Sequence, residues 1–312
     1  MPGLRHTTVC VVRDFQMPQA LRADFERSAT AWLDDSPRSP AVSPRLSASA
    51  LLLREGAAGL NVFVQRRVPQ MAFAPGMVVY PGGAVDARDS HGDIEWERIS
   101  PSRSLTEWAE ILGADPAQIR LIIFAATREL FEECGVLLAG PASEERGDGN
   151  VLGELSDPKW QRHRGALLDR SLSFAELLVA EKLTLRSDLL TPVAHWITPE
   201  CEPRRYDTYF FAATLPPGQH ADGRTSEAVT SQWAPAGQML REHVAGPGTM
   251  MPPTQVLAEQ VDAATDLDDY FARPRSIAPI LPSPVRVAGT LMMRAPIDAS
   301  GTVADDPCSA AG

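Results

Sequence analysis

The sequence is poor in cysteine, in aromatic residues and in long apolar runs, and it has no excess of basic residues. Its four cysteines lie far apart in 312 residues and form no CxxC pair, which argues against a zinc site or disulfide framework and favours a reducing compartment. The longest strongly apolar run, residues 121–126, is too short to cross a bilayer, and no signal peptide is visible. With 29 Lys and Arg against 40 Asp and Glu, the net charge of −11 gives no global attraction to nucleic acid or anionic membranes. We therefore expect a cytoplasmic protein without a nucleic-acid or membrane partner.

What the sequence does contain is enough apolar material for a sizeable core. Apolar residues make up 44% of the chain, which excludes wholesale disorder. Predicted strands and helices interleave without a regular βαβ rhythm, which predicts an α/β or α+β layered domain with a mixed sheet. We expect residues 1–45 to be an N-terminal extension with a proline-rich linker, 46–297 the main domain, and 298–312 a disordered tail.

Local patterns predict the elements of this domain. A glycine turn at 55–59 separates two strand-like runs, which indicates a hairpin. Asp115 followed by Pro116 marks a helix start, with Gln118 placed for a capping box, and Gly135 marks its end. Further helices are expected at 105–112, 172–179 and 252–264, and strands at 193–197, 208–214, 229–233 and 287–293.

The most informative feature is a group of carboxylates on the helix ending at Gly135. Glu129, Glu132 and Glu133 have i, i+3, i+4 spacing and so share one face, where their charges repel each other. Arg128 can compensate part of this charge, and a hard divalent cation with oxygen ligands would compensate the rest. The alternative is a solvated acidic face, as glutamate pairs on helices usually are.

This segment resembles the Nudix box, which reads Arg-Glu, an aliphatic residue, any residue, Glu-Glu, any residue, Gly, and an aliphatic residue. Residues 128–136 match it at every fixed position, and Gly83 in Tyr80-Pro81-Gly82-Gly83 fits the glycine that begins the box. The spacing departs from the pattern, because Arg128 lies 45 positions after Gly83, which predicts an insertion at about 84–114. A second insertion is expected after the box, at about 137–190. An additional acidic residue that the family places about two helical turns before the arginine falls on Arg120.

The resemblance implies a Nudix-type α-β-α sandwich with a mixed sheet and helical insertions. It also implies an enzyme that hydrolyses a phosphoanhydride bond with Mg²⁺ or Mn²⁺. Glu129, Glu132, Glu133 and a backbone carbonyl at Gly83 would hold the metal, with Arg128 beside them. Glu227 resembles an additional Glu that some members use as base or metal ligand, and it is equally well an ordinary loop acid.

Residues 66–83, which include Pro75-Gly76 and Pro81-Gly82-Gly83, are similar to the segment before the box in coenzyme A diphosphatases, although Val68 and Ala72 stand where that segment has Ser and Arg. Residues 194–200 and 203–208, together with the long insertion, are more similar to the branch containing nucleoside-diphosphate-linked-X hydrolase 19. This implies a small nucleotide-type substrate, with coenzyme A or acyl-CoA cleaved to phosphopantetheine and 3′,5′-ADP. Two alternatives remain. One is the same chemistry on ADP-ribose, NADH or a nucleotide sugar, and the other is a Nudix module that senses a nucleotide without turnover. A homodimer is left open.

Substrate contacts are assigned by the same resemblance and by phosphate chemistry. Arg204 and Arg205 could clamp a phosphate, or pair with Asp207 or Glu202. Arg66, Arg67 and Tyr80 are the other substrate-binding candidates, and only one arginine of each pair can face the site from a strand. The aromatic residues Trp196, Tyr206 and Phe210 are more typical of a core, and His195 of a structural role.

Overall fold

The computed structural model describes residues 12–34, 40–71, 73–90, 95–142, 151–225, 227–246, 248–297 and 301. Part of the expected proline-rich linker, most of the expected tail, and Cys10 and Cys308 lie outside these residues. Cys134 and Cys201 are both free thiols. Across the described ranges, no helix combines the length and apolar character that a bilayer crossing requires.

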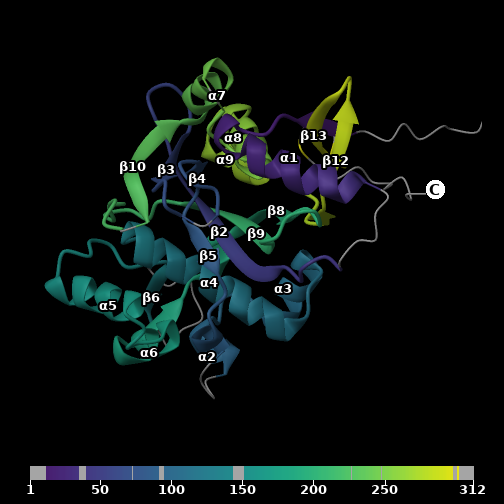
Figure 1. Ribbon diagram of the computed structural model, residues 1–312. Helices are drawn as coiled ribbons and strands as arrows, with labels where there is room; N and C mark the ends of the chain where they lie inside the picture. The colour runs from purple at the N-terminus through teal and green to yellow at the C-terminus, as the bar shows by residue number, and fades with distance from the viewer. Residues whose placement is uncertain are drawn as a thin grey trace, which may run out of the picture.

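A mixed sheet runs through the middle of the molecule (Figure 1). Its central strand, β2 (Arg45–Arg54), is parallel to β9 (Tyr206–Thr214) and antiparallel to β3 (Asn61–Arg67), which confirms the expected mixed sheet. The strand order is β10 (Ala228–Pro235), β3, β2, β9, β8 (Thr191–Ile197) and β11 (Pro279–Ile280), with β4 (Val78–Val79) paired to β3 and β5 (Gly82–Ala84) paired to β2.

The hairpin predicted around residues 55–59 is present, and its strands soon diverge. β2 and β3 pair only next to the turn, at Leu53–Val62 and Arg54–Asn61. Further from the turn β5 takes the place beside β2, with Gly83 opposite Ala48. The sheet therefore holds the Gly82–Gly83 segment against its central strand.

Helices cover both faces of the sheet, which gives the expected α-β-α sandwich (Figure 1). Because side chains alternate along β2, Leu52 packs on the α4 side, whereas Leu51 and Leu53 pack on the α8 side. The α4 side carries η1 (Ala87–Ser90), α2 (Trp96–Ile99), α3 (Leu105–Leu112), α4 (Pro116–Cys134), α5 (Pro158–Leu168), α6 (Phe174–Ala180), η2 (Ser187–Leu189) and the ladder of β6 (Ala139–Pro141) with β7 (Leu183–Leu185). The α8 side carries α1 (Gln19–Leu33), α7 (Ala236–Ala245), α8 (Pro252–Asp262), α9 (Leu267–Ala272) and the sheet of β1 (Arg13–Phe15), β13 (Thr290–Ala295) and β12 (Ser283–Val287).

Two local expectations differ from the structure. Residues 287–293, predicted as one strand, form part of a hairpin, because Ala288 and Gly289 both have positive φ and turn the chain between β12 and β13. Asp115 caps α4 by accepting a hydrogen bond from the backbone N–H of Ala117 at 2.8 Å, rather than through the expected capping box. The N-terminal segment packs onto the body, with Phe25 buried in the α8-side core.

Candidate active site

The carboxylate group lies in the last two turns of α4, and it is buried. Arg128, Glu132 and Glu133 are each about 5% exposed, and the side chain of Glu129 is 12% exposed. Gly135, with φ of 70°, ends the helix directly after them. The alternative of a solvated acidic face is therefore excluded, because these charges lie in the interior of the fold.

Arg128 is the central cation of this cluster. Its Nη1 donates to Glu129 Oε1 and Glu132 Oε2, both at 2.9 Å. Its Nε donates to Asp89 Oδ1 at 3.2 Å, and its Nη2 donates to the carbonyl of Ala84 at 3.2 Å. One guanidinium thus contacts three carboxylates, and it cannot neutralise all the acid around it.

The glycine segment of β5 lies directly against the same helix turn. The backbone N–H of Gly82 donates to Glu133 Oε2 at 3.2 Å. A Cβ added to Gly83 would lie 2.3 Å from Glu129 Oε1, so a side chain at that position would displace the Glu129 carboxylate. The structure therefore brings together the two parts of the sequence pattern that the insertion separates.

Burial makes these carboxylates harder to ionise. It raises the pKa of Glu129 to about 7, an effect that the charge of Arg128 only partly offsets. The pKa of Glu133 lies well above its ordinary value because of burial and the nearby charges of Glu129 and Glu227. Burial also raises the pKa of Glu132, whose Oε1 is buried without a hydrogen-bond partner.

The donor set fits a hard divalent cation, because it offers only oxygen atoms and its carboxyl groups outnumber the one guanidinium of Arg128. Among the residues that the structure describes, however, no three or more His, Cys, Asp or Glu side chains are arranged to hold a metal ion. Arg128 bridges Glu129 and Glu132, so both glutamates would have to exchange a guanidinium contact for a cation contact.

Two further predicted residues lie near the carboxylates. Glu227 Oε2 is 3.8 Å from Arg67 Nη2, and the Glu227 side chain is half-exposed. Glu227 is close enough to Glu129 and Glu133 to raise the pKa of both. An accessible acid and a basic side chain from β3 therefore stand beside the buried triplet.

Tyr80 and Arg205 lie elsewhere and are bound within the fold. Tyr80 is 3% exposed in the α8-side core, and its hydroxyl donates to the carbonyl of Thr254 at 3.0 Å. The guanidinium of Arg205 donates to the carbonyls of Thr198 and Val42. Both side chains are committed to backbone carbonyls, which does not favour the predicted contact with substrate.

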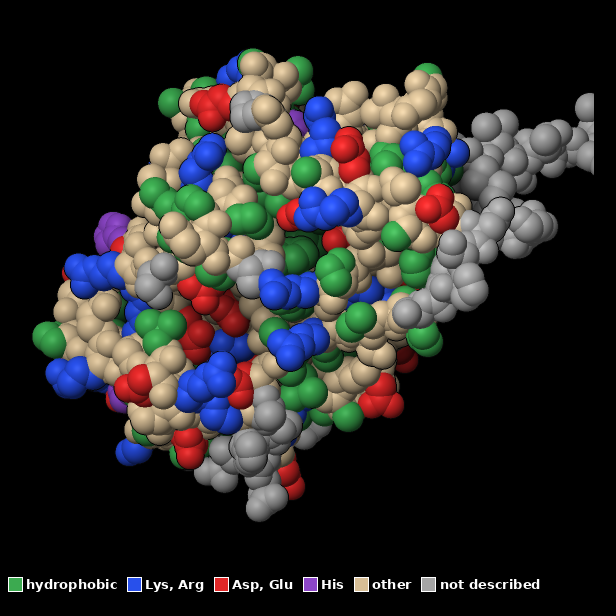
Figure 2. All heavy atoms as spheres, in the orientation of Figure 1, with side chains coloured by type: hydrophobic (Ala, Val, Ile, Leu, Met, Phe, Trp, Pro, Cys, Tyr) green, Lys and Arg blue, Asp and Glu red, His purple; other side chains and the backbone are tan. Residues whose placement is uncertain are grey.

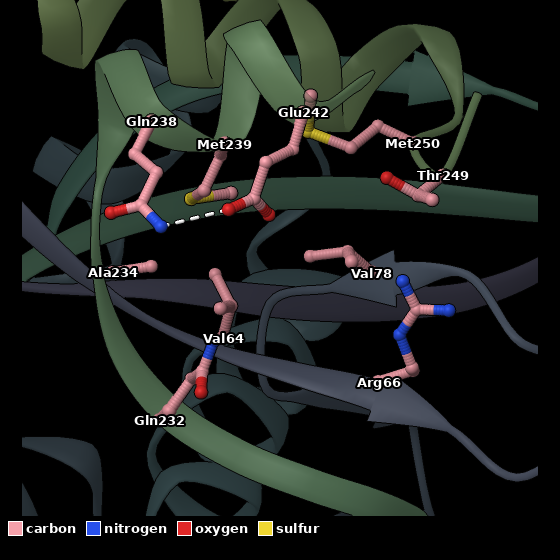
Figure 3. A pocket seen from close by; sticks show the side chains of 10 residues that line it. All are labelled: Val64, Arg66, Val78, Gln232, Ala234, Gln238, Met239, Glu242, Thr249 and Met250. Atoms are coloured by element: carbon pink, nitrogen blue, oxygen red, sulfur yellow. Dashed lines mark hydrogen bonds between the residues drawn. The ribbon is translucent and has the colours of Figure 1, made fainter. Parts of the chain in front are cut away.

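Arg66 and Arg67 face opposite sides of the sheet, as strand alternation predicts. Arg66 lines a cavity of about 220 Å³ between the sheet and α7, with Val64, Met239 and Met250 among the other lining residues (Figure 3). This cavity is on the α8 side, so the sheet separates it from the carboxylates. Arg67 is therefore the member of this pair that can reach the site.

Three of the remaining candidates, Trp196, Phe210 and His195, have the roles expected of core residues. Trp196 and Phe210 are buried in the α8-side core. His195 hydrogen-bonds to Asp207 and stacks on the ring of Tyr209. Arg204 is exposed in the turn just before β9.

Sequence reasoning missed two groups that fix the cluster. Asp89, 1% exposed in η1, pairs with Arg128 although no local motif marks it. Arg164 of α5 donates to the carbonyl of Glu132 at 2.7 Å and pairs with Asp222 at 2.6 Å, which anchors the end of α4. Acidic side chains gather in a hollow on the face shown in Figure 2, over the region of α4 and β5, with Lys and Arg side chains around it.

No protein-family model matches the chain. The acyl-coenzyme A diphosphatase NUDT19 of Xenopus laevis is 22% identical over 209 residues, covering 59% of this chain and 54% of that protein. NUDT19 of Homo sapiens is 28% identical over 207 residues, covering 57% of this chain and 54% of that protein. The putative nudix hydrolase 7 of Caenorhabditis elegans is 25% identical over 229 residues, covering 73% and 65%. The chain thus spans little more than half the length of the NUDT19 relatives.

Among solved structures, a NUDIX hydrolase from Alicyclobacillus acidocaldarius superimposes with a TM-score of 0.60 at 24% identity, covering 74% of this chain and 97% of that one. That likeness shows the fold. The match at residues 128–136 and the curated relatives add a sequence resemblance, and together these findings support a Nudix hydrolase similar to the NUDT19 proteins.

Proposed function

We propose that the chain hydrolyses the diphosphate bond of a small nucleotide-type substrate, with coenzyme A or an acyl-CoA as the substrate class. The observation that carries this proposal is the buried triplet Glu129, Glu132 and Glu133 against the Gly82–Gly83 segment. Three buried carboxylates beside one arginine are costly for a fold, and a site for divalent cations accounts for that cost.

Glu129, Glu132 and Glu133 would hold the Mg²⁺ or Mn²⁺, together with the backbone of Gly83, which lies against Glu129. The bound metal would neutralise the diphosphate and lower the pKa of a bound water. An acidic protein could then take an anionic substrate, because the cations would mediate the contact.

The surrounding side chains supply the remaining parts of a hydrolytic site. Glu227 is accessible and close to the triplet, so its carboxylate would accept the proton of the attacking water. Arg67, from the strand face that carries this site, would contact a phosphate oxygen. Arg128 would keep Glu129 and Glu132 oriented by its hydrogen bonds.

The choice of coenzyme A rests on the similarity to the acyl-coenzyme A diphosphatases NUDT19. Water would add to one phosphorus of the diphosphate, and cleavage of the bridging bond would release 3′,5′-ADP and a phosphopantetheine. The test is product analysis by mass spectrometry with coenzyme A and Mg²⁺, beside ADP-ribose, NADH and a nucleotide sugar.

Glu133→Gln is the variant that ties turnover to the triplet, and Glu110→Gln, on the exposed face of α3, is its matched control. We expect 3′,5′-ADP from the wild type and the control, and none from Glu133→Gln. Cleavage of another substrate in preference to coenzyme A would move the assignment to that substrate. Ligand binding without turnover under saturating Mg²⁺ and Mn²⁺ would favour a sensor.

A further inference from the structure

Arg128 has a carboxylate partner on each of its two sides. Glu129 and Glu132 contact its Nη1, whereas Asp89 contacts its Nε and Nη2 at 3.2 and 3.3 Å. Asp89 belongs to η1, within the segment that separates Gly83 from Arg128. The side chains of Arg128 and Asp89 are 6% and 1% exposed, so solvent hardly screens this ion pair.

On the side of the guanidinium that Asp89 contacts, α4 itself provides no carboxylate partner. At the helix position where the sequence pattern leads one to expect an acid, the chain has Arg120, whose guanidinium lies over the ring of Phe124. The acid that faces Arg128 from outside the helix comes instead from 39 residues earlier in the chain.

We propose that Asp89 is a positioning residue for the metal site, and that it holds Arg128 back so that Glu129 and Glu132 can bind a cation. This inference rests on the proposed metal-dependent function. Asp89 does not touch substrate or metal in this proposal, and it acts through Arg128 alone.

The turn that carries Asp89 is fixed on both sides. The backbone N–H of Asp86 donates to Asp89 Oδ2 at 3.1 Å, and Arg88 donates to the carbonyl of Leu172 at 3.2 Å. The carbonyl of Ala84 accepts from Arg128 Nη2 at 3.2 Å, which adds a second fixed contact on the same side of the guanidinium. Asp89 can therefore resist the pull of Glu129 and Glu132 on Arg128.

The consequence concerns competition between two cations. If Glu129 and Glu132 held a divalent ion, Arg128 would lose its Nη1 contacts with them but would keep a buried anion in Asp89. Without the Asp89 charge, Glu129 and Glu132 would be the only anions in contact with Arg128. The guanidinium would then bind them more tightly and repel an incoming cation.

The experiment measures Mn²⁺ affinity by isothermal titration calorimetry, without substrate. For Asp89→Asn, which keeps the shape and removes the charge, we expect at least about tenfold weaker Mn²⁺ binding. Asp89→Glu, which restores the charge, should recover most of the affinity. Asp86→Asn is the matched control, because it breaks the ion pair with Arg88 at the start of the same turn and leaves the hydrogen bonds of Arg128 in place.

A purely structural role would lower the melting temperature of Asp89→Asn and leave the Mn²⁺ affinity of the folded protein unchanged, and that result would overturn the inference. If Asp89→Asn does not fold, Asp89→Ala replaces it with the same expectation. If Glu133→Gln loses Mn²⁺ binding but Asp89→Asn binds Mn²⁺ as tightly as the wild type, the role of Asp89 is refuted and the proposed function stands. A wild type that binds no Mn²⁺ refutes both.

Discussion

Glu129 makes the metal-free protein sensitive to alkaline pH. Burial raises its pKa from 4.5 to about 7. The folded state therefore holds a proton that the unfolded state has released, and the free energy of unfolding falls as the pH rises between these two values. Above pH 7, a rise in pKa of this size lowers the free energy of unfolding by at most roughly 3 kcal/mol. Glu129→Gln removes the ionisable group, so the variant should gain up to this amount near pH 8 and almost nothing near pH 5.

The assay is urea denaturation with EDTA at both pH values, comparing wild type, Glu129→Gln and the exposed control Glu110→Gln. Glu133 leaves a residual pH dependence in the variant, because burial raises its pKa as well. Saturating Mg²⁺ should instead stabilise the wild type near pH 8, by about 2.7 kcal/mol at one hundred times the dissociation constant. An equal difference between wild type and Glu129→Gln at both pH values would refute the reasoning.

Three other perturbations have distinct expected outcomes. Gly83→Ala should weaken Mn²⁺ binding in calorimetry with little change in melting temperature, because the three atoms nearest its Cβ all belong to the movable Glu129 carboxylate. A large drop in melting temperature would contradict this. Arg164→Met leaves buried groups at the end of α4 unpaired and should cost about 2–3 kcal/mol in chemical denaturation, whereas an unchanged midpoint would count against that anchor. Burial raises the pKa of Glu259, but its hydrogen bond with Arg13 contributes to a net lowering. The ion pair of Arg13 with Glu259 therefore stabilises the fold above the ordinary glutamate pKa, and this stabilisation is lost as the pH falls. The stability deficit of Glu259→Gln should therefore shrink in acid, and a deficit independent of pH would exclude the mechanism.

Much of the fold could be predicted because its signals are local. The start of α4 is marked by Asp115 and Pro116 and its end by Gly135, and the structure places the helix between them. The hairpin of β2 and β3 is likewise marked by its glycine turn. The sequence does not predict the hairpin of β12 and β13, because its turn lies within an apolar run. At that turn Ala288 has a positive φ, which alanine does not favour.

The site could be predicted only in part, because its geometry depends on tertiary contacts. Helical spacing puts Glu129, Glu132 and Glu133 on one face, but spacing does not show whether that face is buried. Tyr80 adjoins the glycine segment in sequence, yet its ring enters the opposite core. Proximity in the sequence thus shows only which segment a residue belongs to. Whether its side chain reaches the carboxylates depends on the side of the sheet that the side chain faces.

Gly83 and Arg128 are far apart in the sequence, yet they meet in one compact site. This is possible because the two ends of the segment between them are held independently. Gly83 is fixed by the pairing of β5 with β2, and Arg128 by the packing of α4 on the same strand. Lengthening a loop between two fixed ends costs little, roughly 0.6 kcal/mol for each doubling. The inserted segment buries Trp108 in the core and places Asp89 against Arg128. The insertion is therefore part of the structure that sets the charge balance of the carboxylates, and loop changes near Asp89 should affect metal binding before they affect the fold.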